Sequence, residues 1–209
     1  MNPESELGGP LTGDLAPGQR SVVLFGKRHV IDMDAVQPYK KCISHGGYYD
    51  DGLNAIVVFA ACYLPQRSVA NYHYIMDNLF LYAVNTLDVL VAEDYVIVYL
   101  QGGATSNRMP SIGWLRKCYQ LIERRHISYT ETGLDDRLRK SLKGLFLVHP
   151  TFWLKTIVTM AKPFLSSKFS RKIRFIDCLN DLSSLIPMDQ VQIPDEVQSF
   201  DREKRMVRH

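Results

Sequence analysis

The chain has 209 residues, a formal net charge of +3, 46% hydrophobic residues and 22% charged residues. These values fit one well-buried soluble domain, and so small a net charge gives no indication of nucleic-acid binding. No apolar run reaches the roughly 18 residues of a membrane span, and the N-terminus lacks the apolar core of a secretory signal. The four cysteines are too widely spaced for a disulfide framework or a CxxC site, so we expect free thiols in a reducing compartment.

The first third of the chain contains few clear elements. Residues 1–30 are rich in Gly, Pro and Ser and only weakly periodic, which predicts a mostly disordered segment. Residues 32–41 indicate a short helix or an extended entry segment, and residues 45–54 (HGGYYDDGLN) have the composition of a turn. A continuously apolar run at 55–62 (AIVVFAAC) then predicts a strand covered on both faces, and the apolar spacing of 69–91 predicts a helix.

The rest of the chain alternates between the two kinds of element. Residues 95–100 (YVIVYL), 145–148 and 173–178 each predict a buried strand. Thr151 is a candidate N-cap for a helix over 152–161. This alternation predicts an α/β fold with a mainly parallel β-sheet, flanked by helices on both faces.

Charge is divided unevenly along the chain. Residues 137–176 contain ten basic residues and no acidic one, whereas residues 68–107 contain four acidic residues and no Lys or Arg. Such a division suits an acidic partner or an anionic lipid surface. Charged stretches also commonly do no more than keep a protein soluble, and the pattern alone does not separate these readings.

Motifs of known chemistry are missing from the sequence. There is no GxGxxG fingerprint, Walker loop or GxSxG elbow, and Gly102-Gly103 fits an ordinary turn. His45 and His149 lie at strand or loop edges, where structural roles are favoured because no nucleophile stands in a recognised spacing. Cys62 falls in an apolar strand and is expected to pack in the core. We therefore predict a protein that is not an enzyme and that holds no metal and no cofactor.

Four long blocks of the sequence resemble, in the same order, one known family. They resemble the BCH domain of the BNIP proteins, caytaxin and a related Rho GTPase-activating protein, in the blocks HGGYYDDGLNAIVVFAACYLP (45–65), YHYIMDNLFLYAVNTLDVLVAEDYVIVYL (72–100), MPSIGWLRKCYQLIERR (109–125) and LVHPTFWLKTIVTMAKPFLSSKFSRKIRF (147–175). The resemblance covers residues 31–197, which we take as the domain, followed by a polar tail at 198–209. It implies a CRAL-TRIO-like fold.

The same resemblance implies that the protein is a non-enzymatic intracellular scaffold. Such a scaffold self-associates and binds Rho-family small GTPases and their regulators, with effects on cell shape and migration. We expect such a protein in the cytoplasm and peripherally at membranes, with no nucleic-acid partner. The alternative is a CRAL-TRIO-type module that holds a lipid at a membrane surface.

Three departures from the family pattern bear on this expectation. The sequence has no Rho GTPase-activating catalytic domain, so we do not expect it to accelerate GTP hydrolysis. It has no Trp-centred acidic motif ahead of the domain, so recruitment of a kinesin motor by that route is not supported. Twelve additional residues, 126–137, separate two basic pairs that are adjacent in the family, and we expect them to form an exposed loop that weakens partner binding at that face.

These expectations assign two sets of residues. The predicted partner-binding set combines basic side chains with the tail segment that related domains use for GTPase recognition: Arg124, Arg125, Arg139, Lys140, Lys143, Lys168, Arg171, Lys172, Pro187, Met188, Asp189 and Gln190. The predicted lipid-pocket set lies on a helix that resembles the mobile gate of lipid-binding relatives: Phe152, Trp153, Ile157, Met160, Phe164 and Leu165. Simple packing of that helix on the sheet remains the alternative for the second set.

Overall fold

The computed structural model describes residues 15–24, 27–49, 54–90, 94–115, 142–165 and 167–207, without the side chains of residues 88, 90 and 168. Its centre is a five-stranded sheet in the order β3-β4-β5-β6-β7. The bounds are β3 Ile43–Tyr49, β4 Asn54–Ala60, β5 Asp94–Leu100, β6 Leu142–Val148 and β7 Ile173–Ile176. Strands β4 to β7 run parallel and β3 is antiparallel to β4, which confirms the predicted, mainly parallel sheet.

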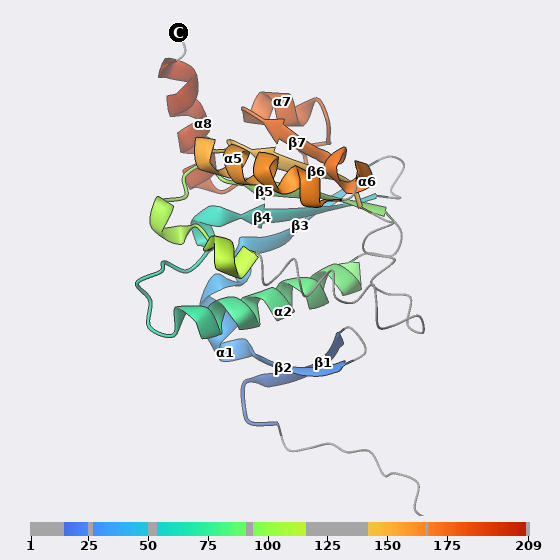
Figure 1. Ribbon diagram of the computed structural model, residues 1–209, viewed down its shortest axis with the longest axis vertical. Coiled ribbons are helices and arrows are strands. Elements are labelled where there is room, and N and C mark those ends of the chain that lie inside the picture. Colours follow the sequence, from blue (N-terminus) through green and yellow to red (C-terminus); the bar gives the residue numbers. More distant parts are fainter. Residues whose placement is uncertain are drawn as a thin grey trace, which may run out of the picture.

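Helices lie on both faces of this sheet (Figure 1). The α-helices are α1 Met33–Val36, α2 Tyr72–Leu90, α5 Phe152–Ala161, α6 Ser167–Ser170, α7 Leu179–Ser183 and α8 Asp195–Val207. Short 3-10 turns are η1 Gln37–Cys42, η2 Ala61–Tyr63, η3 Ser106–Arg108 and η5 Lys162–Phe164. Figure 1 shows α2 on one side of the sheet, with α7 and α8 on the other.

Strand β4 shows why the sheet is buried on both faces. Ile56, Val57 and Val58 are consecutive, and each has at most 1% of its surface exposed. Because successive side chains of a strand point to opposite faces, both faces must be covered. Val57 packs in one cluster with Met76 of α2, whereas Ile56 and Val58 pack in another with apolar residues of α7 and α8.

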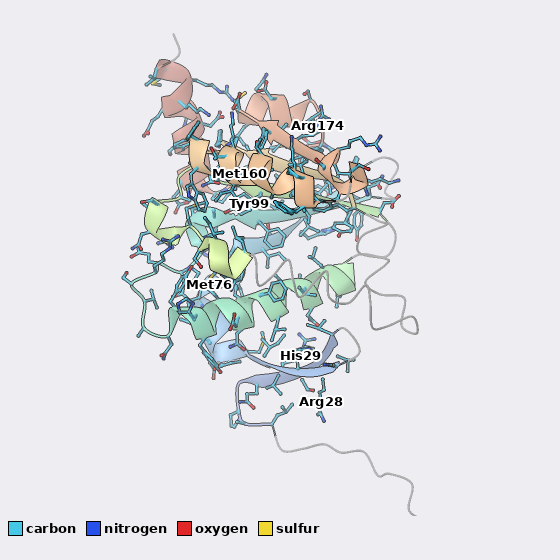
Figure 2. All side chains as sticks on the ribbon, viewed as in Figure 1. Arg28, His29, Met76, Tyr99, Met160 and Arg174 are labelled. Atoms are coloured by element: carbon cyan, nitrogen blue, oxygen red, sulfur yellow. The ribbon has the colours of Figure 1, made fainter. Side chains whose placement is uncertain are left out.

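An N-terminal hairpin corrects the prediction of disorder for residues 19–24 and 27–30, whereas residues 1–14 lie outside the described structure. Strands β1 (Gln19–Leu24) and β2 (Lys27–Asp32) pair in antiparallel register. Val22, Leu24 and Ile31 are buried in the cluster that contains Met76, so α2 is covered by the sheet on one side and by the hairpin on the other. Figure 1 shows this layer beneath α2, and Figure 2 labels Met76 and, on the hairpin, Arg28 and His29. The short strands carry a weak periodic signal because their burial depends on contact with a distant helix.

Strand β3 corrects the prediction of a turn at residues 45–54, of which residues 50–53 lie outside the described structure. The paired glycines mark an irregularity inside the strand, where the register with β4 shifts between His45 and Tyr48. Gly47 has a φ of +84°, and a Cβ at Gly46 would come within 2.9 Å of the Ile56 side chain. The glycines therefore allow a bulge and a close approach between two paired strands.

Helix α8 corrects the predicted domain end at residue 197 and the polar tail after it. It continues to Val207, and both Val197 and Asp201 are buried, at 0% and 3% exposed. The sequence of this segment is mostly polar because only one side of the helix packs against the domain.

Candidate interaction surface

The carboxyl edge of the parallel strands, where α/β proteins commonly hold their sites, is closed by α8. Gly102 and Gly103 follow β5, and His149 follows β6. A Cβ at Gly102 would come within 2.5 Å of His149 Nδ1, and one at Gly103, which has a φ of +72°, would come within 2.8 Å of the Glu196 carbonyl oxygen. The two glycines thus let the first turn of α8 approach the sheet edge.

A buried pair of side chains fastens α8 at this edge. His149 Nε2 lies 2.7 Å from Asp201 Oδ1, and the two side chains are 0% and 4% exposed. Asp201 Oδ1 also accepts the Leu179 backbone N–H at 2.9 Å, and its Oδ2 lies 2.6 Å from Arg205 Nη2. The pair therefore connects β6, α7 and α8.

Protonation of the pair follows from its surroundings. Burial lowers the pKa of His149, despite the opposing effect of Asp201. Burial acts against ionisation of Asp201, but the Leu179 N–H, His149 and Arg205 outweigh it and lower the pKa of this carboxyl group. At neutral pH a neutral imidazole therefore donates its Nε2–H to a carboxylate.

The pair resembles half of a catalytic triad but lacks the geometry of one. Its remaining ring nitrogen, Nδ1, is buried, has no hydrogen-bond partner in the described part of the chain and faces Gly102. The Phe200 ring packs edge-on against the imidazole, with centroids 5.2 Å apart. Because Nδ1 is enclosed, it cannot activate a nucleophile, and the pair instead holds α8 against the sheet edge.

The tail segment combines buried anchors with exposed residues. Ile186 and Val191 are 3% and 8% exposed and belong to the main core cluster. Between them Pro187, Asp189 and Gln190 are exposed, whereas Met188 is half-buried against the same cluster. Gln190 also covers β3, where a Cβ at Gly47 would come within 2.2 Å of its Oε1. The segment between Ile186 and Val191 is thus a short, partly exposed stretch with a buried residue at each end.

The predicted basic residues are only partly described. Arg124, Arg125, Arg139 and Lys140, together with the additional residues 126–137, lie outside the described structure, and so does the side chain of Lys168 in α6. Arg171 is exposed, and its Nε donates to the Ser167 carbonyl oxygen at 3.2 Å. Lys172 is half-buried. Lys162 and Arg174 are exposed nearby in sequence, and Figure 2 labels Arg174 on β7.

The opposite charges seen in the sequence are partly paired within the chain. Lys143, from the basic stretch, lies 2.9 Å from Asp94 of the acidic stretch. Lys155 lies 3.3 Å from Asp177. These residues are therefore satisfied without a second molecule, so a self-association surface built from the two stretches loses part of its predicted complementarity.

Helix α5 presents a mixed set of side chains. Thr151 caps it as predicted, accepting the Leu154 N–H at 3.3 Å. Of the predicted lipid-pocket residues, Ile157 and Leu165 are half-buried and Trp153 is 37% exposed. In contrast, Phe152, Met160 and Phe164 are 86%, 69% and 79% exposed, and Figure 2 labels Met160 on this helix. With these exposures, the three side chains neither line a cavity beneath α5 in this conformation nor pack on the sheet.

Two further observations concern the described ranges. No helix in them is long and apolar enough to cross a membrane. Within the same ranges, no three His, Cys, Asp or Glu side chains are grouped so that they could hold a metal ion.

Sequence reasoning did not find Asp201 or the α8 contact. The one local signal is the spacing of Asp201 and Arg205, which are separated by one helical turn. The partner of Asp201, His149, is 52 positions away in sequence, and no motif connects the two.

The chain is similar to two described families that together cover most of its length. Residues 53–203 match the divergent CRAL/TRIO domain, and residues 17–52 match the family described as Bcl2-/adenovirus E1B nineteen kDa-interacting protein 2. These ranges include the β1–β2 hairpin and most of α8. The resemblance drawn from the four sequence blocks is confirmed, with wider limits than residues 31–197.

Individual proteins give a consistent result. Caytaxin of Macaca fascicularis is 48% identical over 204 residues, which is 98% of this chain and 51% of caytaxin. Rho GTPase-activating protein 1 of Mus musculus is 35% identical over 146 residues, 70% of this chain and 30% of that protein. The crystal structure of Sfh5 matches with a TM-score of 0.53 at 10% identity, covering 83% of this chain and 67% of that one, which supports the fold alone. The chain spans about half the length of caytaxin.

Proposed function

This chain belongs to the divergent CRAL/TRIO domain family, of the type found in caytaxin, and on that premise we propose that it is a non-enzymatic scaffold for Rho signalling. In this proposal it binds Rho-family small GTPases and their regulators at the cytoplasmic side of membranes. Its similarity to Rho GTPase-activating protein 1 supports that class of partner. The enclosed His149–Asp201 pair fits a protein that binds rather than catalyses.

The observation that carries the proposal is the tail segment from Pro187 to Gln190. Its ends are fixed, because Ile186 and Val191 are buried in the core. Its polar side chains, Asp189 and Gln190, are exposed. A fixed segment with exposed polar groups loses little conformational entropy on binding, which favours recognition of a specific partner.

The basic residues of α6 and the turn after it supply the second part of the proposed contact. They are Lys168, Arg171 and Lys172. Exposed charges mainly increase the association rate and fix orientation, and they are screened over about 8 Å at physiological salt. Binding to a Rho-family GTPase should therefore weaken as the salt concentration rises.

The test is a binding titration of the full chain with a purified Rho-family GTPase, loaded with GDP or with a GTP analogue. The triple substitution of Lys168, Arg171 and Lys172 to Glu should weaken binding and reduce its salt dependence. Arg202→Glu is the control for charge reversal at another place, because Arg202 is exposed and lies on α8. Unchanged binding by a folded triple variant would remove the basic residues from the contact, and no binding by the unmodified chain would reject the proposal.

Self-association is a further part of the proposed scaffold function. The Lys143–Asp94 and Lys155–Asp177 pairs reduce the electrostatic share of such a contact, so apolar surface must supply most of its affinity. Sedimentation at low and high salt should show a dimer in both conditions. A monomer at tens of micromolar under both would contradict self-association.

A second candidate function is favoured by one observation, the exposure of Phe152, Met160 and Phe164 on and next to α5. Exposed large apolar side chains provide contact area for a protein or a membrane surface. The fold family includes lipid-binding members, which makes a lipid surface the natural alternative partner. Native mass spectrometry separates the two functions, because a co-purifying lipid favours the lipid module and a lipid-free dimer favours the scaffold.

A further inference from the structure

The β1–β2 hairpin lies on the side of α2 that faces away from the main sheet (Figure 1). Val22, Leu24 and Ile31 bury its inner face in the cluster that contains α2. Its outer face is open, because Val23 and Val30 are 68% and 44% exposed. Within the described ranges, each of the two strands pairs only with the other. The hydrogen-bonding groups along the outer edge of each strand must therefore be accounted for separately.

The register of the hairpin fixes which backbone groups point outward. Leu24 pairs with Lys27 across a two-residue turn, and in such a hairpin the closing pair exchanges backbone hydrogen bonds. Every second pair does the same, so residues 20, 22 and 24 of β1 point their N–H and C=O groups at β2. Residues 19, 21 and 23 therefore point theirs away from β2.

Two recorded hydrogen bonds agree with this alternation. Met33 and Gly18 continue the register beyond the strands, at a hydrogen-bonded position, and the Met33 N–H donates to the Gly18 carbonyl oxygen at 2.8 Å. Asp32 stands at an outward position of β2, and its N–H donates to Asn78 Oδ1 of α2 at 2.8 Å. The outer edge of β2 is thus partly satisfied by α2.

The outer edge of β1, formed by Ser21 and Val23, is open. Each residue directs an N–H and a C=O outward, and no partner for these groups is recorded in the part of the chain that the structure describes. Because such groups repeat at every second residue of an extended chain, the chemistry that matches them is another extended chain. α2 already holds β1 in place, so little order has to be gained on its side of the contact.

Charge indicates which extended chain fits the β1 edge. Arg20 is exposed on the face of β1 that is turned toward α2. Arg28 belongs to β2, but its Nε donates to Ser21 Oγ at 2.7 Å, which brings the guanidinium to β1 on the outer face. Lys27 at the turn is also exposed. The one acidic residue in the sequence of the two strands, Asp32, is half-buried, so the hairpin presents mainly positive charge.

The same cations argue against a second copy of this chain as the occupant. Two hairpins joined at their β1 edges would bring Arg20 and Arg28 of both copies into one four-stranded sheet, where like charges repel. A strand that carries carboxylates reverses the sign of this interaction.

We propose that the β1 edge binds an extended acidic segment of a partner protein, which adds to the hairpin as a third, antiparallel strand. Partner residues that face Val23 and Val22 are apolar. The next two face Ser21 and Arg20 and are acidic, because they meet Arg28 on one face of the sheet and Arg20 on the other. The recognised pattern is therefore two β-branched residues followed by two carboxylates.

The first test is an NMR titration of the full chain with the end-blocked peptide TVVEET. The Ser21 and Val23 amide signals should shift downfield and reach a plateau, because their N–H groups gain acceptors. The Val30 amide, which points outward from β2, should not respond. The peptide TVVKKT is the charge control and should bind about tenfold more weakly. No plateau at Ser21 and Val23, or equal binding of the two peptides, would overturn the proposal.

Proline substitutions test the backbone contact. Val23→Pro deletes one outward N–H and leaves the hydrogen bonds between β1 and β2 in place, since proline is tolerated on an edge strand whose N–H faces outward. Binding of TVVEET should fall about tenfold. Val30→Pro is the matched control, because Val30 is also an exposed valine with an outward N–H, but on β2. It should leave binding unchanged, and equal effects of the two substitutions would overturn the assignment to β1.

Charge reversal gives a test that does not depend on tolerance of proline. Arg20→Glu combined with Arg28→Glu changes two exposed side chains and should reverse the preference, so that TVVKKT binds more tightly than TVVEET. An unchanged preference for TVVEET in this folded variant would overturn the acidic partner.

Sedimentation of the full chain separates the acidic segment from a second copy. Val23→Pro and Val30→Pro should have the same oligomeric state, because the β1 edge takes no part in contacts between copies. A dimer that Val23→Pro abolishes and Val30→Pro retains would show that another copy occupies the β1 edge, and would overturn the proposal.

Discussion

His149 Nε2 donates to Asp201 Oδ1 across 2.7 Å, and this one contact joins the end of β6 to α8 over 52 positions of sequence. His149 itself has a φ of +52°, a conformation that few non-glycine residues adopt. Packing around the ring must therefore offset backbone strain as well as burial of two polar groups. The position of α8, and so the closure of the sheet edge, depends on this pair.

The first prediction concerns the removal of one partner. Asp201→Ala should lower the free energy of unfolding by about 3 kcal/mol or more, because it leaves the buried His149 and the Leu179 N–H without their acceptor. Chemical denaturation measures this change. Arg205→Gln, which removes the half-exposed partner on the same carboxylate, should cost less than about 1 kcal/mol. Similar losses of unfolding free energy in both variants would show that the buried His149–Asp201 contact stabilises the fold no more than the half-exposed Arg205 contact does.

The pH dependence of stability has a definite sign. Burial keeps the pKa of His149 below its ordinary value of 6.5, so below pH 6.5 the unfolded chain binds a proton that the folded chain does not. Stability should therefore be complete above about pH 6.5 and decline as the pH falls below it. Asp201, whose pKa is lowered from 3.8, acts in the same direction at lower pH.

Denaturation at several pH values tests this sign. His149→Asn, which tolerates a positive φ, should reduce the slope of stability against pH between about 5 and 6.5, whatever its effect at neutral pH. An unchanged slope would mean that another group causes the acid sensitivity.

The glycines under α8 give a third prediction. Gly102→Ala and Gly103→Ala should each cost roughly 1–3 kcal/mol of stability, because the added Cβ would lie 2.5 Å from His149 Nδ1 and 2.8 Å from the Glu196 carbonyl oxygen, respectively. Gly113→Ala is the control, since its Cβ would meet nothing nearer than 4.0 Å. Thermal melts of the three variants measure the difference. Equal melting temperatures would show that α8 moves freely to accommodate the methyl groups.

Local pattern explains what could be predicted from the sequence. Thr151 and the apolar run at 55–62 carry their signals within a few residues, and both the N-cap and the strand are found. The hairpin and α8 carry no such local signal, because their burial depends on partners that are distant in the sequence. Only Val197 and Asp201 are buried in α8, which leaves no apolar periodicity to detect. The basic and lipid-pocket residues remain predictions, since exposure on the surface does not by itself identify a partner.

The last prediction separates binding from stability in the tail segment. Asp189 and Gln190 are exposed, so Asp189→Lys with Gln190→Ala should weaken binding to a Rho-family GTPase while changing the free energy of unfolding by less than about 0.5 kcal/mol. Ile186→Ala, in the buried anchor beside them, should instead cost about 2–4 kcal/mol and impair binding only through unfolding. A GTPase titration paired with chemical denaturation on each variant measures both quantities. If the exposed pair leaves binding unchanged and only the anchor has an effect, the segment closes the core and the GTPase contact lies elsewhere on the domain.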